Sequence, residues 1–312
     1  MNFYVLICFI QVFNLVLFYL ISFPKLIYKG GCFVKVAFWS NSNELCGVSA
    51  NLAAVSVISA IRYSCSIITL ENRLSHQNLG VAYNGGSYTD VLHEAGTNYY
   101  DGSGIEGLLR KIYRGDLSPG GLMVYLKEII QGRLYYLPQS RVIHNEIFDY
   151  ELDRCIRPLF QILEKNSELC FIDTASNHSL STRIILEEAE LIVVNLCQKS
   201  AILEDFFLNH SSLISKSIFL ISNYEHHSLY NMRQIAKLLQ VPSEQIIPIP
   251  VNEGYRAAYR GGYVYEYISR NLGCARESGD YIFIQSVKRA AYLIMKKAKS
   301  MPGCAMPRSC AR

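Results

Sequence analysis

The sequence has few charged residues: only 18% of its 312 positions are Asp, Glu, Lys or Arg, while 50% are hydrophobic. A chain so poor in charge and so rich in apolar residues is neither intrinsically disordered nor a coiled coil, and it is long enough to bury a sizeable core. The formal net charge is +4 and the sequence pI is near 8.4. Because this positive balance is mild, we predict no sequence-specific nucleic-acid partner.

The ten cysteines include no Cys-x-x-Cys pair and do not cluster with histidines as metal ligands do. Scattered thiols in a chain of this size favour a reducing cytoplasm over a disulfide framework or a zinc site. His226 and His227 are adjacent, but their side chains diverge and the sequence offers no third ligand nearby, so we expect them in a surface loop. Cys46 has no accompanying base, which argues against nucleophilic catalysis by its thiol. The sequence assigns no catalytic residue.

Residues 1–32 differ from the rest of the chain. Residues 3–22 are almost continuously apolar, which is the length that crosses a hydrocarbon core as a helix, and Lys25 and Lys29 follow them. One interpretation is a membrane anchor that leaves the remaining chain in the cytoplasm. The other is a mis-assigned start, with Lys29-Gly30-Gly31 translated from a ribosome-binding site and Val34 from a GTG start codon. Residues 300–312 are expected to form a disordered tail.

After Phe33, short apolar runs alternate with longer segments of helical pattern. The predicted strands are Val34–Trp39, Ser66–Leu70, Leu134–Leu137, Leu169–Asp173, Leu191–Leu196, Ser217–Ser222 and Ile246–Ile249. The predicted helices are Val48–Tyr63, Gly104–Arg114, Leu122–Ile130, Phe148–Lys165, Thr182–Ala189, Ala201–Asn209, Leu229–Leu239 and Asp280–Lys299. Residues 72–103 are rich in Asn, Gly, Ser and Tyr, and we expect irregular structure there.

This alternation predicts an α/β fold, with a mostly parallel central sheet and helices on both faces, in one domain over residues 33–299. In such a three-layer sandwich the ligand binds beyond the carboxyl ends of the strands, so function is expected in the loops after Trp39, Leu70, Ile172 and Ile221. A Rossmann dehydrogenase is set aside, because the loop after the first strand reads Ser-Asn-Ser-Asn-Glu-Leu and lacks G-x-G-x-x-G.

Several of these segments carry a more specific pattern. The segment Gly47-Val-Ser-Ala-Asn-Leu-Ala-Ala54 opens the first helix, and Leu134–Pro138 is a strand that ends in Leu-Pro. The segment Cys170-Phe-Ile-Asp-Thr174 is a buried strand that ends in Asp-Thr, and Phe219-Leu-Ile-Ser-Asn223 ends in Asn. In this order, over roughly residues 33–272, the chain resembles the MinD/ParA class of P-loop ATPases, which use a deviant phosphate loop of the form KGGxGKT/S.

The resemblance implies an ATP site with Mg²⁺. It places the phosphates at the start of the first helix, the metal on a hydroxyl and a carboxylate, a switch acid after the second strand, and the adenine edge on an asparagine. The corresponding residues are Cys46, Gly47, Val48, Ser49 and Ala50 for phosphate, Ser49 and Asp173 for the metal, Glu71 for the switch and Asn223 for adenine. It further implies a homodimer and a protein partner in a secretion or pilus, partition or division system.

The departures from the family pattern lie at the phosphates. Val48 stands where the family has its phosphate-loop lysine, and Asn43 stands at the lysine specific to this class. Glu44 adds a negative charge, although the start of the helix still attracts anions. Because phosphoryl transfer depends on positioned positive charge, we expect weak nucleotide binding with little or no ATP hydrolysis.

Two functions remain open. One is a nucleotide-dependent positioning or regulatory switch; the other is a pseudo-ATPase that serves as an interaction scaffold without turnover. Arg73 offers a replacement positive charge, but long side chains in loops usually face solvent. The basic helix Asp280–Lys299 has apolar residues at helical spacing, so it either packs on the sheet, which we prefer, or lies on a membrane surface.

Overall fold

The computed structural model describes residues 33–42, 46–73, 78–84, 104–116, 121–139 and 145–301. These form an eight-stranded sheet in the order β3-β4-β2-β5-β1-β6-β7-β8. The strands are β1 (Val34–Trp39), β2 (Ile67–Glu71), β3 (Lys127–Ile130), β4 (Leu134–Tyr136), β5 (Leu169–Asp173), β6 (Leu191–Leu196), β7 (Ser217–Ser222) and β8 (Ile246–Ile249). Strand β3 pairs antiparallel with β4, and the other pairings are parallel, as predicted. The apolar segment 3–22 and the tail from residue 302 lie outside the described residues.

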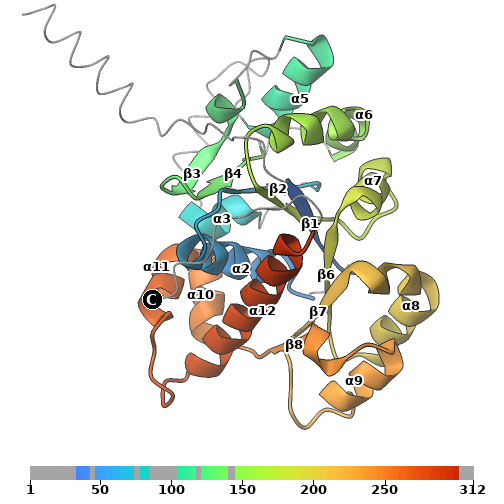
Figure 1. The fold of residues 1–312 in the computed structure, drawn as a ribbon, viewed down its shortest axis with the longest axis vertical. Helices are drawn as coiled ribbons and strands as arrows, with labels where there is room; N and C mark the ends of the chain where they lie inside the picture. The colour runs from blue at the N-terminus through green and yellow to red at the C-terminus, as the bar shows by residue number, and fades with distance from the viewer. Residues whose placement is uncertain are drawn as a thin grey trace, which may run out of the picture.

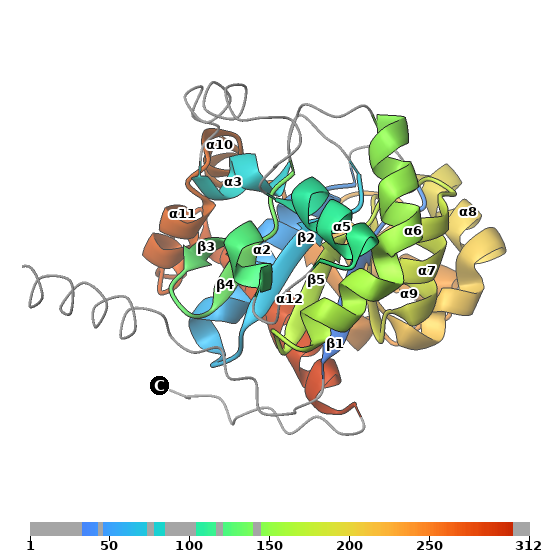
Figure 2. The same ribbon diagram turned by 90° about the horizontal axis from the view of Figure 1, so that it is seen from above.

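Helices cover the sheet on both faces (Figures 1 and 2). One layer contains α2 (Val48–Arg62), α3 (Leu79–Asn84), α10 (Glu253–Gly261), α11 (Val264–Asn271) and α12 (Tyr281–Lys299). The other contains α5 (Ile105–Arg114), α6 (Asn145–Glu164), α7 (Leu180–Glu188), α8 (Ser200–His210) and α9 (Met232–Leu239). Each layer encloses its own apolar core against the sheet. The predicted α/β three-layer fold is therefore confirmed.

Burial on both faces explains the strand sequences. Every residue of β2, β5, β6 and β7 is buried, so these strands read as continuous apolar runs rather than as alternating patterns. Helix α2 is also apolar on almost all sides, because α11 and α12 pack over it from outside while the sheet lies beneath. The start of α2 is thus fixed rigidly at the carboxyl edge of the sheet.

The predicted helix Leu122–Ile130 is wrong. A short 3₁₀ helix, η1 (Gly121–Tyr125), comes first, and β3 follows and turns back onto β4. Gly132 lies in the connecting turn with φ 68°, a left-handed conformation that glycine adopts without strain. A glycine between two β-branched or aromatic runs is a hairpin pattern, which the apolar content of the first run masked.

The prediction of irregular structure over residues 72–103 is wrong in part. The described portion contains α3, whose Leu79, Ala82 and Tyr83 are buried against the core of the α2 layer. This helix is only six residues long. The packing of its three buried apolar side chains therefore stabilises the helix. The helix is too short to give a helical periodicity that could be recognised in the sequence. The remaining residues, 85–103, lie outside the described part of the chain.

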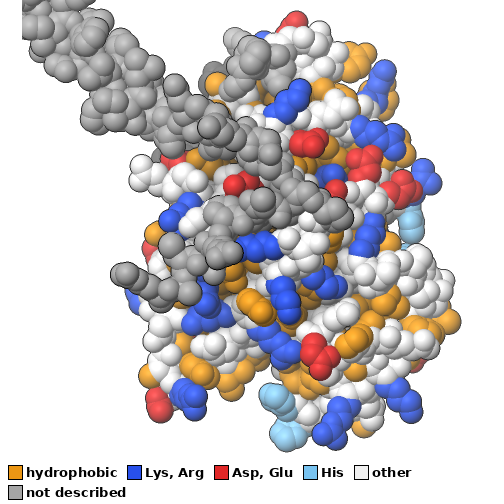
Figure 3. All heavy atoms as spheres, in the orientation of Figure 1, with side chains coloured by type: hydrophobic (Ala, Val, Ile, Leu, Met, Phe, Trp, Pro, Cys, Tyr) orange, Lys and Arg blue, Asp and Glu red, His pale blue; other side chains and the backbone are white. Residues whose placement is uncertain are grey.

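The last helix packs on the sheet, as preferred from the sequence. Phe283, Val287, Ala291 and Ile294 of α12 are buried in the core. Of its basic side chains, Lys297 donates from Nζ to the Ser217 carbonyl oxygen (2.9 Å). In Figure 3, which shows the face carrying α12, the Lys and Arg side chains lie among hydrophobic and acidic ones. Among the described residues, no helix has the length and apolar character needed to cross a membrane.

Candidate functional site

The chain has a topological switch point at the carboxyl edge of the sheet, which is where α/β folds form a ligand crevice. From β1 the chain runs through α2 to β2, on one side of β1 in the strand order, and from β5 it runs through α7 to β6 on the other side. Helices α2 and α7 also lie on opposite faces of the sheet. The loops after β1 and β5 therefore diverge, and the opening between them is where α/β sheets bind ligands.

Helix α2 begins at this crevice. Its N-cap is Gly47, with φ 71°, and a Cβ there would lie 3.1 Å from the Ser222 hydroxyl, so both the backbone and the packing require glycine. The first N–H groups of a helix have no partner within it and form its positive end. The predicted phosphate-binding residues lie together at this helix start: Cys46, Gly47, Val48, Ser49 and Ala50.

The predicted metal ligands meet each other directly. The Ser49 hydroxyl, on the first turn of α2, donates to Oδ2 of Asp173, the last residue of β5. Arg73, which the sequence argument left facing solvent, joins them: its Nη2 donates to Ser49 Oγ (2.7 Å) and lies 3.5 Å from Asp173 Oδ2. The Asp173 side chain is fully buried, while 38% of the Arg73 side chain is exposed.

Hydrogen bonds to its backbone neighbours hold Arg73 in this position. The Gln139 side-chain amide donates to the carbonyl oxygens of Glu71 (3.1 Å) and Arg73 (2.7 Å). Between them, Asn72 donates its backbone N–H to the Asp173 carbonyl oxygen (3.1 Å) and its side-chain oxygen accepts from the Ala175 N–H (2.6 Å). The segment after β2 is therefore fixed against β5, and Arg73 is presented from a constrained backbone.

Glu71, the predicted switch acid, is fully buried and lies opposite Asp173 in the β2–β5 pairing. Burial, and next the negative charge of Asp173, raises the pKa of Glu71 to about 8. Its oxygens accept from the Tyr136 hydroxyl (2.8 Å) and the Leu79 N–H (3.2 Å). Burial therefore favours the neutral form of Glu71, whose side chain lies in the interior of the protein.

The charges of this cluster balance when one carboxyl group is neutral. Burial raises the pKa of Asp173, and the Arg73 guanidinium and the Ser49 hydroxyl act against that rise. Arg73 contacts Asp173 but not the side-chain oxygens of Glu71 in any hydrogen bond of the described structure. The Arg73 guanidinium is therefore paired with the Asp173 carboxyl group, and burial favours the neutral form of Glu71 through its raised pKa.

A hydroxyl and a carboxylate are the oxygen donors that Mg²⁺ prefers, so the chemistry of Ser49 and Asp173 suits that ion. Their arrangement does not fit it. The two oxygens bond directly to one another, and a guanidinium lies against both of them. Mg²⁺ needs oxygens at about 2.0–2.1 Å in octahedral geometry. Of the Ser49 and Asp173 side-chain oxygens, Oδ1 of Asp173 alone has no hydrogen-bond partner among the described residues, and it is buried.

A buried polar network ties the start of α2 to the next two strands. The Asn51 side chain donates to Asn195 Oδ1 of β6 (2.8 Å) and to Ser222 Oγ of β7 (2.9 Å). Ser222 in turn donates to the Cys46 carbonyl oxygen (2.6 Å). Asn223, predicted to contact adenine, follows Ser222 with φ 51°, is exposed, and accepts from Arg256 Nη2 (3.0 Å).

The other residues considered from the sequence lie away from this cluster or within the core. The Cys46 side chain is buried and forms no disulfide with the other described cysteines. His226 and His227 are exposed in the connection between β7 and α9, where the His226 ring contacts Tyr224 edge-on. Within the described residues, no group of three or more His, Cys, Asp and Glu side chains could hold a metal ion.

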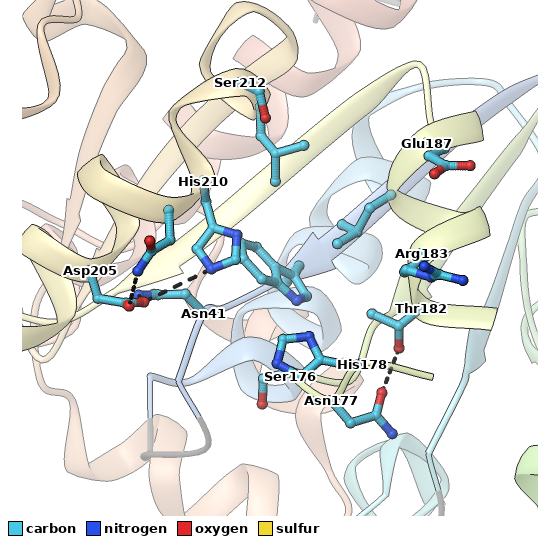
Figure 4. A pocket seen from close by; sticks show the side chains of 14 residues that line it. Asn41, Ser176, Asn177, His178, Thr182, Arg183, Glu187, Asp205, His210 and Ser212 are labelled. Carbon is cyan, nitrogen blue, oxygen red and sulfur yellow. Dashed lines mark hydrogen bonds and ion pairs between the residues drawn. The ribbon is translucent and has the colours of Figure 1, made fainter. Parts of the chain in front are cut away.

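A separate cavity of about 490 Å³ lies on the opposite face of the sheet, between α7 and α8 (Figure 4). On the α8 side, Asp205 Oδ2 accepts from the Asn41 amide (2.7 Å) and lies 3.9 Å from His210 Nε2. Trp39 Nε1 and Asn41 Oδ1, both buried in this wall, have no hydrogen-bond partner among the described residues. The sequence had pointed to the loop after Trp39, but nothing in it indicated this cavity.

Comparison with known sequences identifies no relative: no family profile and no curated protein matches the chain. Solved structures do match. A ParA family ATPase from Chlorobium tepidum TLS superposes with a TM-score of 0.63 at 13% identity, over 83% of this chain and 98% of that one. The cell-division ATPase MinD of Pyrococcus furiosus gives 0.62 at 14%, over 84% and 98%.

The septum site-determining protein MinD of Pyrococcus horikoshii OT3, complexed with Mg-ADP, gives a TM-score of 0.61 at 16% identity, over 85% of this chain and 97% of that one. The TM-scores establish the fold, whereas sequence identities this low do not identify the ligand of this chain. The match extends over nearly the whole of each of these solved structures and agrees with the motifs found in the sequence. This chain therefore has the MinD/ParA-type P-loop fold.

Proposed function

We propose that this protein binds an adenine nucleotide at the start of α2, hydrolyses it slowly or not at all, and uses it as a regulatory or positioning switch. One observation carries the proposal: the Ser49 hydroxyl on the first turn of α2 meets Asp173 at the end of β5. The positive end of a well-anchored helix thus opens on the crevice of a fold shared with ATPases. The MinD structure with Mg-ADP holds its nucleotide in the same fold.

The low turnover follows from the charges at the same place. Val48 supplies no positive charge at the lysine position, and Arg73 is engaged with Ser49 and Asp173. A transferring phosphoryl group needs cationic groups that follow the developing charge. The site is therefore suited to recognising phosphate rather than to stabilising its transfer. We propose a homodimer and a protein partner in a secretion or pilus, partition or division system as the context of this switch.

A second function, a nucleotide-free scaffold, is favoured by a different observation. The two groups that would contact the ends of a nucleotide already have intramolecular partners: Ser49 bonds to Arg73 and Asp173, and Asn223 accepts from Arg256. If these contacts persist, the crevice serves only to hold the fold together. Nucleotide titration separates the two functions.

The test is a matched pair of charge substitutions at Val48. Val48 is half-buried at the first position of α2, so Val48→Lys restores a cation beside the phosphates and Val48→Glu places an anion there at similar size. Charges at about 4 Å interact by about 1–4 kcal/mol near a protein surface, which predicts at least a roughly tenfold tighter Kd for Val48→Lys than for Val48→Glu. Calorimetry or a fluorescent ATP analogue measures both.

Val48→Gln is the neutral control and should lie between the two. Phosphate release by the wild type should be slow or no faster than in buffer. If ATP fails to bind the wild type and Val48→Lys alike at millimolar concentration, the scaffold replaces the switch. Equal affinities of Val48→Lys and Val48→Glu would place the nucleotide elsewhere on the molecule.

A further inference from the structure

We propose that the Arg73 guanidinium takes the place of the divalent cation in this fold, so that the site accepts a phosphate group without Mg²⁺. The identity of the ligand as a nucleotide rests on the function proposed above, whereas the exclusion of the metal rests on the triad itself. The inference starts from the misfit between Mg²⁺ and the residues that would ligate it.

The guanidinium lies on the same two oxygens that a metal would need. Arg73 Nη2 is 2.7 Å from Ser49 Oγ and 3.5 Å from Asp173 Oδ2. Ser49 accepts from Arg73 and donates its one hydroxyl hydrogen to Asp173, which leaves one lone pair on Oγ. A metal that ligates both Ser49 Oγ and Asp173 Oδ2 would have to displace the guanidinium.

The position of Arg73 is built into the fold. Its own carbonyl oxygen is held by Gln139, and the preceding Asn72 is bonded to β5 at Asp173 and to Ala175. The Asn72 amide also donates to Thr182 Oγ1 at the start of α7 (2.9 Å). Since three neighbouring elements fix this segment, the side chain starts from a constrained place beside Asp173 rather than from a free loop.

The electrostatics favour one cation here and disfavour a second. The Asp173 side chain is fully buried, and the Arg73 guanidinium lies 3.5 Å from its Oδ2 and 2.7 Å from Ser49 Oγ. A divalent ion placed on the same two oxygens would lie next to this permanent positive charge and would be repelled by it. Arg73 therefore supplies the positive charge beside the strand-end carboxyl group.

The triad also keeps hydrogen-bonding capacity for a ligand. Arg73 Nε is buried and has no acceptor among the described residues. Exposure of 38% of the Arg73 side chain leaves part of it open to solvent at the start of α2. Guanidinium donors match phosphate oxygens in a planar, paired geometry, and the first N–H groups of a helix bind the same ligand. A phosphate group can thus be held between Arg73 and α2.

Two measurements on the full chain test this inference. The first is calorimetric titration with ATP in EDTA and in Mg²⁺. The second is electron paramagnetic resonance of Mn²⁺, as a probe of divalent-ion binding without nucleotide. The wild type should bind ATP with Kd values within about twofold of each other in the two buffers and should not bind Mn²⁺. Wild-type affinity that rises roughly tenfold or more with Mg²⁺, or Mn²⁺ binding by the wild type, overturns the inference.

Arg73→Ala and Arg73→Lys complete the test, with circular dichroism to establish that each variant is folded. Arg73→Ala should lose roughly tenfold or more in ATP affinity in EDTA and should gain Mn²⁺ binding. Arg73→Lys keeps the charge and should exclude Mn²⁺ as the wild type does. If Arg73→Ala gains no Mn²⁺ binding, the guanidinium is not in the cation position. If no variant binds ATP, the proposed function fails, while the Mn²⁺ results still decide this inference.

Discussion

The triad of Ser49, Arg73 and Asp173 and the cavity between α7 and α8 lie at the same carboxyl edge of the sheet but on opposite faces. In the triad, a buried carboxylate is paired with a cation and a hydroxyl. The cavity is open, and two buried polar atoms in its wall, Trp39 Nε1 and Asn41 Oδ1, have no partner among the described residues.

The stability of the fold should depend on the polar groups of the triad. It should depend little on the exposed polar groups of the cavity wall. Removing a member of a closed, buried charge cluster leaves an uncompensated charge, which is strongly destabilising. The exposed groups on the cavity wall, such as Arg183 and Glu187, are reached by water, so their removal has little effect on stability. Substitutions in the triad should therefore lower the free energy of unfolding more than substitutions on the cavity wall do.

The largest expected effect is loss of the Arg73 charge. Arg73→Met leaves the buried Asp173 carboxylate without its cation. Breaking a buried pair costs about 3–5 kcal/mol, and because 38% of the Arg73 side chain is exposed, solvent screening should reduce the cost below this range, to about 2–3 kcal/mol. Urea denaturation measures the free energy of unfolding.

The matched control lies on the cavity wall. Arg183 is an exposed residue of α7, and Arg183→Met should lower the free energy of unfolding by no more than about 0.5 kcal/mol. Equal losses at the two arginines would mean that the triad is no more than a surface contact.

The second prediction concerns the pH dependence of stability. Glu71 has a pKa raised to about 8 in the folded protein against an ordinary value of 4.5. Between these values the folded state keeps a proton that the unfolded state releases, so stability falls as pH rises. The slope is at most about 1.4 kcal/mol per pH unit. Glu71→Gln, which resembles the protonated carboxyl, should flatten the curve over this range.

Glu187→Gln is the matched control for replacing a carboxylate by an amide, because Glu187 is exposed on the cavity wall. Urea denaturation at several pH values between 5 and 8 (roughly the interval that separates the two protonation states) provides the data. If the free energy of unfolding varies with pH in the same way for the wild type and Glu71→Gln, the pKa of Glu71 is not raised by folding. The charges assigned to Glu71 and Asp173 would then be wrong.

The smallest effect is expected at His210 in the cavity wall. Burial lowers the pKa of His210 below 6.5, and Asp205, whose Oδ2 lies 3.9 Å from Nε2, raises it in part. The folded state therefore binds this proton less well, so the contribution of His210 to stability is lost as pH falls below 6.5. A nuclear magnetic resonance titration should give a midpoint under 6.5, and Asp205→Asn should lower it further. A midpoint above 6.5 would show that the Asp205 charge outweighs burial.

Much of the architecture could be predicted from the sequence. The strands Val34–Trp39, Leu169–Asp173 and Ile246–Ile249 were placed at their observed bounds, because parallel strands buried on both faces appear as short continuous apolar runs. The hairpin of β3 and the six-residue α3 were missed. Both depend on contacts with distant elements rather than on a local period.

The candidate site shows the same limit more sharply. The family resemblance predicted that Ser49 and Asp173 lie at one site, and in the structure the two side chains are in contact. The sequence did not reveal that Arg73 joins them, because an arginine after a strand usually faces solvent. The decisive contacts come from Gln139 and Asn72, which fix the Arg73 backbone through hydrogen bonds to segments that are remote in sequence.

The most direct test of the central claim is the anomalous X-ray signal of crystals of the full chain grown with ATP and Mn²⁺. The account predicts no manganese peak between Ser49 Oγ and Asp173, with the Arg73 guanidinium in contact with both. A manganese peak at about 2.1 Å from these oxygens, with Arg73 turned away, would contradict it.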